Sequence, residues 1–298
     1  MRNAGISFRH SKSSSRLRLF ALLCCTVFIN CAGVSADRKP KRIFIDPGHT
    51  KVTNSVSGIV GEEYIVNYRV CRYLKEMLDA DKRFTADLNR DETDYIPGIK
   101  AFHRSNNTFL RGVVATVVPG EHRNTAMTAE QNAELYAVRH YAISNRYDLL
   151  VSVHFDYLLE RYRSRQASTK GFHVTASPFN RRFDESLGAA SNIAKALGVR
   201  YKPNRAIDHD TPFITPEHKK NYPLAAFLAD GVVIRSLIIL GDAFENSYVK
   251  KNRMTAVDDV PSVLIECGFL HEKQFCDDAE LKELARMIYN GIVLFGAE

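Results

Sequence analysis

The sequence lacks internal repeats, low-complexity tracts and any cysteine spacing of the zinc-finger type. These absences argue against a repeat architecture and against a small metal-finger module. The 298 residues are 45% hydrophobic and 25% charged, which is the composition of an ordinary globular protein. The length suits one α/β domain of moderate size or two small ones, with a core large enough to fold without disulfides.

The first 36 residues contain no acidic side chain. A basic stretch is followed by the apolar run LFALLCCTVFINCAG and by the small residues VSA. This pattern predicts a secretory signal peptide, residues 1–36, cleaved after Ala36, because the apolar run is short for a membrane span. A membrane anchor that is not cleaved is the alternative. Lipidation of Cys31 fits poorly, because Asn30 stands where that processing prefers a small residue. We therefore expect export to the periplasm or to the outside of the cell.

Positive charge is concentrated in this leader. The whole chain has a formal net charge of +7, and loss of the five basic side chains of residues 1–36 leaves +2. The high isoelectric point therefore gives no support for nucleic-acid binding.

Half of the six cysteines also lie in the leader. The remaining three are Cys71, Cys267 and Cys276, an odd number. A Cys267–Cys276 disulfide could form after export, but buried free thiols are the simpler expectation.

Strand-like and helix-like segments alternate over residues 37–298, as in α/β proteins. We expect strands at 42–46, 84–89, 148–155, 171–177, 234–240 and 261–269. We expect helices from near Glu62 to 81, from 129 to 147, from 183 to 198 and from 278 to 295, with Thr128 and Gln131 as a capping box. The prediction is a single three-layer α/β sandwich, with about six strands in a mostly parallel or mixed sheet flanked by helices.

Four polar side chains occupy equivalent places in this pattern. His49 follows the first strand, Glu63 lies in the first turn of the next helix, and His154 and Glu266 end two later strands. Because parallel strands bring their carboxyl ends to one sheet edge, these side chains can converge. Two imidazoles and one carboxylate suit a catalytic zinc site with an open position for water, and a further carboxylate can act as general base.

Each of these residues also has a structural explanation. His49 could cap a turn, Glu63 could complement the helix dipole, and His154 could be a hydrogen-bonded core histidine. Glu266 is harder to explain in this way, because a carboxylate among apolar neighbours is costly unless it is paired or ligating. Asp46 could orient a ligand histidine through its second ring nitrogen or could simply cap the turn.

The order and context of these residues resemble the zinc-dependent N-acetylmuramoyl-L-alanine amidases of type 3. The matching segments are IFIDPGH, GEEYIVN, DLLVSVH and PSVLIECGFL, with NRDETD (89–94) and Gly171 in addition. The resemblance runs from about residue 41 to the C-terminus. Glu63, unlike Glu62, has an Asn four residues later. The resemblance therefore implies one Zn²⁺ held by His49, Glu63 and His154, with Glu266 as catalytic base.

The chain departs from the family pattern at a few positions. Thr50 and Lys51 replace glycines that usually follow the first histidine, and Cys267 replaces a common Thr. Phe155 and Asp156 stand where the family often has Ala-Asn. No departure removes a ligand or the base, so we expect activity, with altered contacts at the rim of the site.

The resemblance implies hydrolysis of the amide between the lactyl group of N-acetylmuramic acid and L-alanine in peptidoglycan. A zinc peptidase or deacetylase with another substrate is one alternative, and a non-catalytic wall-binding protein of the same fold is another. We expect peptidoglycan as the partner and no nucleic acid, and a protein activator could take part. The sequence gives no substrate-binding residues and no oligomeric state.

Residues 95–127 interrupt the alternation of strands and helices. Several Pro, Gly and Asn residues punctuate this stretch, and we expect an irregular insertion or loop. It could cover the zinc edge as a lid, with Glu121 or His122 at the open metal position, or it could be a solvated loop.

Overall fold

The computed structural model describes residues 39–53, 56–116, 127–157, 170–204, 230–254 and 258–296. The chain divides into two units, residues 1–39 and 40–298, and the second contains all of the described helices and strands. The predicted signal peptide lies outside the described residues. Among the helices that are described, we find none whose length and apolar character would let it span a membrane.

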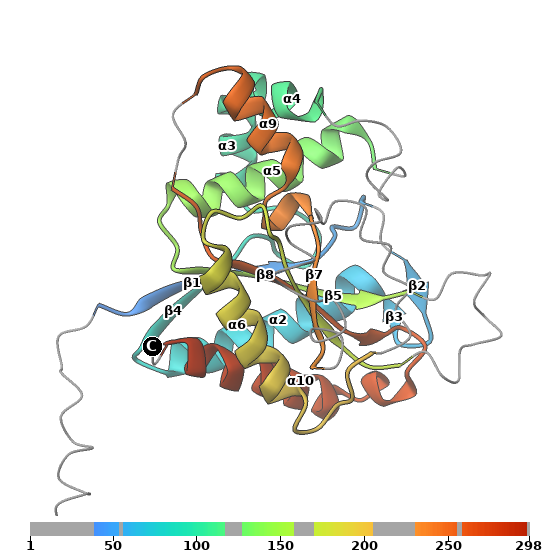
Figure 1. The fold of residues 1–298 in the computed structure, drawn as a ribbon. Coiled ribbons are helices and arrows are strands. Elements are labelled where there is room, and N and C mark those ends of the chain that lie inside the picture. Colours follow the sequence, from blue (N-terminus) through green and yellow to red (C-terminus); the bar gives the residue numbers. More distant parts are fainter. Residues whose placement is uncertain are drawn as a thin grey trace, which may run out of the picture. The chain divides into compact units, whose positions relative to one another are not determined.

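A six-stranded sheet in the order β4-β1-β5-β8-β6-β7 forms the centre of this unit (Figure 1). The strands are β1 (Lys41–Pro47), β4 (Phe84–Leu88), β5 (Leu149–Asp156), β6 (His173–Ala176), β7 (Val232–Ile234) and β8 (Ser262–Phe269). All neighbouring strands are parallel except the pair β6 and β8. The prediction of a mostly parallel, mixed sheet is confirmed. A small hairpin of β2 (Ser57–Gly58) and β3 (Gly61–Glu62) precedes the first long helix.

Helices cover both faces of the sheet (Figure 1). One layer contains α2 (Glu63–Ala80), α6 (Phe183–Leu197) and α10 (Asp278–Gly296), together with the 3₁₀ turn η3 (Lys273–Cys276). The other contains α3 (Pro97–Ser105), α4 (Asn107–Val114), α5 (Ala129–Ser144), α9 (Ala243–Lys251) and the 3₁₀ turn η2 (Ile238–Leu240).

The central strands are apolar on both faces because each face is covered. Ile43 and Ile45 of β1 pack into the core cluster of α2, α6 and α10. Phe44, between them, packs into the cluster of α3, α5 and η2. Alternating strand residues point to opposite faces, so the unbroken run IFI fills two cores at once. The three-layer sandwich is therefore confirmed.

The capping box of α5 also forms as predicted. The Thr128 side chain accepts from the Gln131 backbone N–H, and the Thr128 backbone N–H donates to Gln131 Oε1 at 2.8 Å. This satisfies two backbone donors at the start of a helix that lines a cavity at the carboxyl ends of the strands.

The prediction that residues 95–127 are irregular is wrong for the part that is described. Pro97 opens α3 at a position where the missing N–H costs nothing, and α4 follows directly. Leu110 and Val113 of α4 are buried against α5, which gives this segment a core of its own. Residues 117–126, with Glu121 and His122, lie outside the described residues.

The strand expected at 234–240 is also placed differently. β7 ends at Ile234, and residues 238–240 form η2 instead. A short apolar run is compatible with a strand or with a buried helical turn, so its periodicity could not separate the two.

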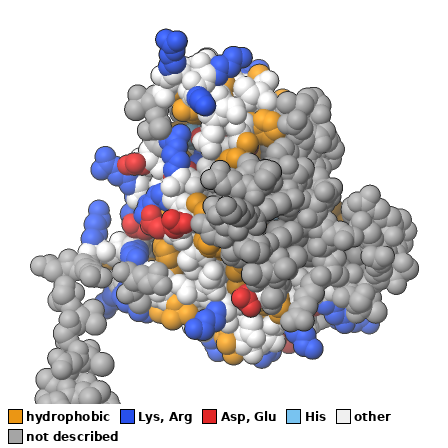
Figure 2. All heavy atoms as spheres, viewed as in Figure 1, with side chains coloured by type: hydrophobic (Ala, Val, Ile, Leu, Met, Phe, Trp, Pro, Cys, Tyr) orange, Lys and Arg blue, Asp and Glu red, His pale blue; other side chains and the backbone are white. Residues whose placement is uncertain are grey.

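The three cysteines of the second unit are free thiols. Cys71 and Cys267 are buried as expected, whereas Cys276 is exposed, and no disulfide joins Cys267 to Cys276. On the face drawn in Figure 2, the Lys and Arg side chains of the described residues are interspersed with acidic and uncharged groups.

Candidate metal centre

His49 is placed by a tight turn at the end of β1. The Gly48 backbone N–H donates to Val153 O of β5 at 2.9 Å, and His49 follows with a φ of 62°, which is uncommon outside glycine. A Cβ on Gly48 would lie 2.1–2.4 Å from three ring atoms of His154. Only glycine therefore lets the turn pass this close to the second histidine.

Glu63 is the first residue of α2 and is 3% exposed. Asn67, one helical turn later, donates to Glu63 Oε1 at 3.4 Å and to Gly48 O at 2.9 Å. The Asn that the motif spacing singled out thus ties the start of α2 to the turn that carries His49.

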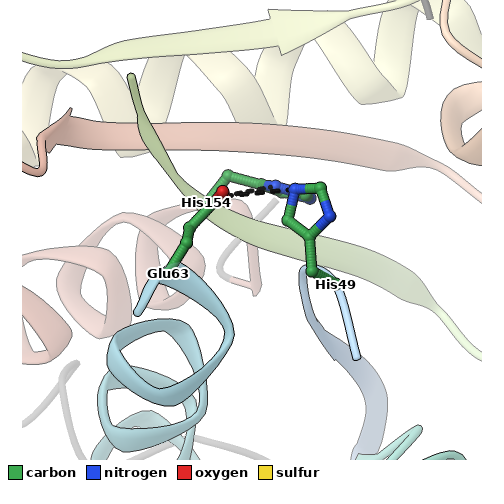
Figure 3. A group of neighbouring side chains, drawn as sticks. All are labelled: His49, Glu63 and His154. Atoms are coloured by element: carbon green, nitrogen blue, oxygen red, sulfur yellow. Dashed lines mark hydrogen bonds and ion pairs between the residues drawn. The ribbon is translucent and has the colours of Figure 1, made fainter. Parts of the chain in front are cut away.

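The structure brings His49, Glu63 and His154 together. Glu63 Oε1 lies 3.3 Å from His49 Nε2 and 3.1 Å from His154 Nδ1. The two imidazole rings are 4.9 Å apart and nearly perpendicular. Figure 3 shows the three side chains pointing toward one another from the turn after β1, the start of α2 and β5.

This donor set fits a zinc ion. One ligand atom from each residue lies within 4.8 Å of the others. A tetrahedral zinc with bonds of about 2.0–2.1 Å holds neighbouring ligand atoms roughly 3.3 Å apart, close to the two measured separations. Two imidazoles and one carboxylate, as predicted, also leave a fourth position open.

The charge state of Glu63 suits a metal ligand. Burial alone would raise its pKa, but hydrogen bonds from His154 and His49 outweigh burial and lower the pKa to about 2. Glu63 is therefore an ionised carboxylate at neutral pH, as a ligand must be.

Glu266 lies beside the three residues on the neighbouring strand. His154 of β5 and Glu266 of β8 are register partners in a parallel pair, so their side chains emerge on the same face. Both line a cavity of about 180 Å³ together with His49. Glu266 Oε2 is enclosed, and it has no hydrogen-bond partner among the described residues. A buried acceptor left in this state can bind a water molecule or a ligand in the cavity.

The surroundings of Glu266 favour its neutral form. Burial raises the pKa of Glu266 well above its usual range, and the negative charges of Asp156 and Glu63 raise it further, while Arg235 opposes them. Burial likewise raises the pKa of Asp156 to about 6. A carboxyl group with a raised pKa is suited to taking up and releasing a proton near neutral pH.

The described contacts of Asp46 differ from both roles that the sequence suggests. Its two oxygens accept hydrogen bonds from the Asn89 amide and the Ser152 hydroxyl. Asp46 therefore joins β1 to its two neighbours, below the turn that carries His49. Among the described contacts, none joins Asp46 to a ring nitrogen of His49 or His154.

Arg90 is a functional neighbour that the sequence pattern did not assign. It lies in the segment NRDETD and is 1% exposed. Its guanidinium donates to Pro47 O at 2.7 Å, to Gly48 O at 3.3 Å and to Tyr64 O at 2.6 Å. Arg90 thus grips the backbone next to two of the three candidate ligands. The only sequence signal was an arginine inside a motif that fits the family.

Hydrogen bonds from the backbone N–H groups of Thr50 and Lys51 hold the chain just after His49. The Thr50 backbone N–H donates to Thr53 Oγ1 at 2.6 Å, and Lys51 N–H donates to Thr93 O at 3.1 Å. Both donors are backbone groups, so glycine at either position could make the same hydrogen bonds.

Comparison with known proteins gives a family that agrees with this geometry. The family model described as N-acetylmuramoyl-L-alanine amidase matches residues 43–293. This chain belongs to the N-acetylmuramoyl-L-alanine amidase family. The match extends from β1 into α10, so it contains all four residues of the site.

Solved structures of amidases share the fold. The amidase Ami1 from Mycobacterium smegmatis has a TM-score of 0.51 and 16% identity, over 86% of this chain and 97% of that one. The amidase AmiC2 of Nostoc punctiforme has a TM-score of 0.50 and 14% identity, over 87% and 98% of the two chains. At this identity the likeness concerns the fold alone. No curated protein sequence gives a significant match to this chain.

Proposed function

We propose that this amidase is an exported zinc enzyme that hydrolyses the amide between N-acetylmuramic acid and L-alanine in peptidoglycan. The single observation that carries the proposal is the convergence of His49, Glu63 and His154 beside a Glu266 oxygen that has no hydrogen-bond partner among the described residues, within a chain of this family. His49, Glu63 and His154 would hold one Zn²⁺, which supplies carbonyl polarisation and activation of water at neutral pH when bound.

Glu266 carries the proton transfers in this mechanism. Its carboxylate accepts the proton of the water that attacks the amide carbonyl carbon. It then gives that proton to the departing amine nitrogen, because an amide nitrogen leaves readily only when it is protonated. The raised pKa of Glu266 helps the second transfer. A neighbouring divalent cation would lower this pKa and so help the first.

The remaining residues position these groups. Gly48 allows close approach of the two histidines, Asn67 joins the Glu63 carboxylate to the turn, and Arg90 holds both segments. The site is therefore preorganised by backbone contacts and does not depend on the side chains alone.

The experiment that tests this function removes only the proposed base. In Glu266→Gln, release of stem peptides from purified peptidoglycan should fall by roughly a thousandfold or more, because general acid–base catalysis is lost. Metal analysis should still find one zinc per chain. The matched control is Glu185→Gln, which removes an exposed carboxylate on α6 and should keep full activity. Full activity of the Glu266 variant would refute the assignment.

Product analysis separates the amidase from a zinc peptidase or deacetylase. Mass spectrometry of the released material should find stem peptides that begin with a free L-alanine amine. Cleavage at another bond would support the alternative chemistry. A wall-binding protein without activity would release nothing and would purify without stoichiometric zinc.

Export is proposed from the leader. The basic stretch, the apolar run and the small residues before Asp37 support cleavage after Ala36. The exported protein should therefore begin at Asp37 on N-terminal sequencing. An intact N-terminus on the membrane-bound protein would favour the anchor instead.

A further inference from the structure

The cavity beside the metal centre continues well beyond the proposed catalytic residues. It extends from His49 and His154 past Glu266 to the strands at the far edge of the sheet. The described residues that line this extension include Leu135, His173, Thr175, Arg235 and Ile238. None of them is among the proposed metal ligands, so this part of the cavity is a candidate for contact with the substrate.

Arg235 is brought to this cavity by the register of β6 and β7. Thr175 of β6, which lines the cavity, pairs with Val233 of β7. The Arg235 backbone N–H donates to Ala176 O at 3.1 Å, so the ladder continues just past the end of β7. Arg235 lies two residues after Val233 and therefore on the same face as Thr175.

Arg235 gives the extension its charge. It is the only Lys or Arg that the described part of the chain contributes to the cavity lining. Its guanidinium also acts on Glu266 and Asp156, lowering the pKa of each against the effect of burial. A guanidinium offers five N–H donors, so it can hold neighbours and still present a pair of donors to a carboxylate.

Apolar side chains that line the same cavity make this charge more effective. Leu135 of α5, Ile238 and Ile239 of η2 and Leu264 of β8 are apolar side chains that line the same space. Apolar side chains exclude water and weaken its screening, so an arginine that shares a cavity with them attracts an anion more strongly than an exposed arginine does.

The dimensions suggest which part of a stem peptide reaches Arg235. β7 is the second strand beyond β8, so the two strands are roughly 10 Å apart. With the scissile carbonyl beside Glu266, two extended residues of the stem cover at most about 7 Å. The long arginine side chain can span the rest. The first residue therefore stays near Glu266, and the second lies within reach of the guanidinium.

We propose that Arg235 binds the free carboxylate of the second stem residue, so that the enzyme selects peptidoglycan stems with a carboxylate there over stems with a carboxamide. This inference rests on the proposed amidase function. It assigns a substrate subsite to the far end of the cavity, formed by Arg235 with the apolar wall of α5 and η2.

The test uses two synthetic N-acetylmuramoyl tripeptides and the zinc-loaded mature protein. In both tripeptides the second residue is a glutamate joined to the third through its side-chain carboxyl. Its α-carboxyl group is free in one peptide and a carboxamide in the other, and the C-terminus is amidated in both. The unmodified protein should have a kcat/KM at least about tenfold higher for the carboxylate form, as expected for a charged hydrogen bond. In Arg235→Gln this ratio should fall to near one. Arg235→Lys should restore part of the preference.

The control and the contrary outcomes are distinct. Arg104→Gln removes the same charge from an exposed position on α3 and should leave the preference unchanged. If the unmodified protein cleaved both peptides equally, the subsite proposal would be overturned, whereas the proposed amidase function would stand. This outcome needs no variant. An equal loss on both peptides in Arg235→Gln would also overturn it, because Arg235 would then act through Glu266. If neither peptide were cut at the N-acetylmuramoyl–L-alanine bond, the proposed function itself would fail, and the inference with it.

Discussion

Single residues that touch no substrate decide how well the proposed metal ligands are held. Arg90 is the clearest case, because one buried guanidinium binds the carbonyls of Pro47, Gly48 and Tyr64. Two of the three ligands are direct chain neighbours of these carbonyls. Loss of these hydrogen bonds should make the positions of both His49 and Glu63 less well fixed.

We expect Arg90→Lys to weaken zinc binding by about tenfold or more, because lysine keeps the charge but cannot reach three carbonyls at once. Competition with a chromophoric chelator measures the zinc Kd directly, independently of activity. Circular dichroism checks that the variant is folded. The matched control is Arg182→Lys, whose side chain pairs with Glu185 on the surface. A folded Arg90 variant with an unchanged zinc Kd would show that the Arg90 hydrogen bonds are not needed for zinc binding.

Glu63 and Arg90 illustrate the limit of sequence reasoning at this scale. Glu63 was predicted because its spacing to Asn67 matched a family motif, and the structure shows the Asn67 contact that this spacing permits. The contacts of Arg90 join backbone atoms of two other segments. No local pattern around residue 90 encodes their position.

At the scale of elements, a buried ionic network joins helices α5 and α9 to the segment just before β8. Arg139 of α5 pairs with Glu245 of α9 and, at 2.6 Å, with Asp259 just before β8. His140 Nε2 lies 2.9 Å from the other oxygen of Glu245. The network fixes α5, which lines the cavity, relative to the strand that carries Glu266.

This network predicts a specific dependence of stability on pH. Burial would raise the pKa of Glu245, but Arg139 and His140 lower it from its ordinary 4.5 to about 2. Because the pKa of Glu245 is lower in the folded state than in the unfolded state, its ionised form stabilises the folded protein above about pH 4.5. This contribution is lost as the pH falls toward about 2.

We therefore expect Glu245→Gln to destabilise the protein by roughly 3 kcal/mol at neutral pH, with a difference that shrinks between pH 4.5 and 2. Urea unfolding at several pH values measures this difference. Glu185→Gln, in an exposed ion pair, should stay within about 0.5 kcal/mol of the unmodified protein throughout. A difference for Glu245→Gln that did not change with pH would contradict the assigned pairing.

The elements themselves were predictable where their signals are local. The capping box of α5 and the strands around residues 42–46 and 148–155 depend on neighbours a few residues apart, and they form as expected. The helices α3 and α4 were missed because Pro and Gly suggested a loop. Burial of Leu110 and Val113 against α5 outweighs that local preference.

At the scale of the whole catalytic unit, a bound metal ion would join three separate elements. The candidate ligands come from the turn after β1, from α2 and from β5. The unfolded chain has no such preformed site, so zinc should stabilise the folded state selectively.

We expect zinc at about a hundredfold above its Kd to add roughly 2.7 kcal/mol and to raise Tm by about 5–10 °C. Thermal unfolding of the metal-free and zinc-loaded protein measures this shift. His154→Ala should abolish it, whereas His271→Ala, outside the ligand set, should keep it. An equal shift in both variants would place the stabilising zinc elsewhere on the chain.

The sequence by itself determined most of the strands and the helices α2, α5, α6 and α10, but not α3 or α4, and it determined the chain positions of His49, Glu63, His154 and Glu266. Each of these follows from interactions between residues close in the chain, or from a motif read in order. Only the tertiary structure decided that the three ligand atoms meet and that Arg90 grips two of their segments. It also decided that Arg235 lines the same cavity. The reason is that strand register and helix packing join residues up to about 250 positions apart, and these long-range contacts leave no periodic trace in the sequence.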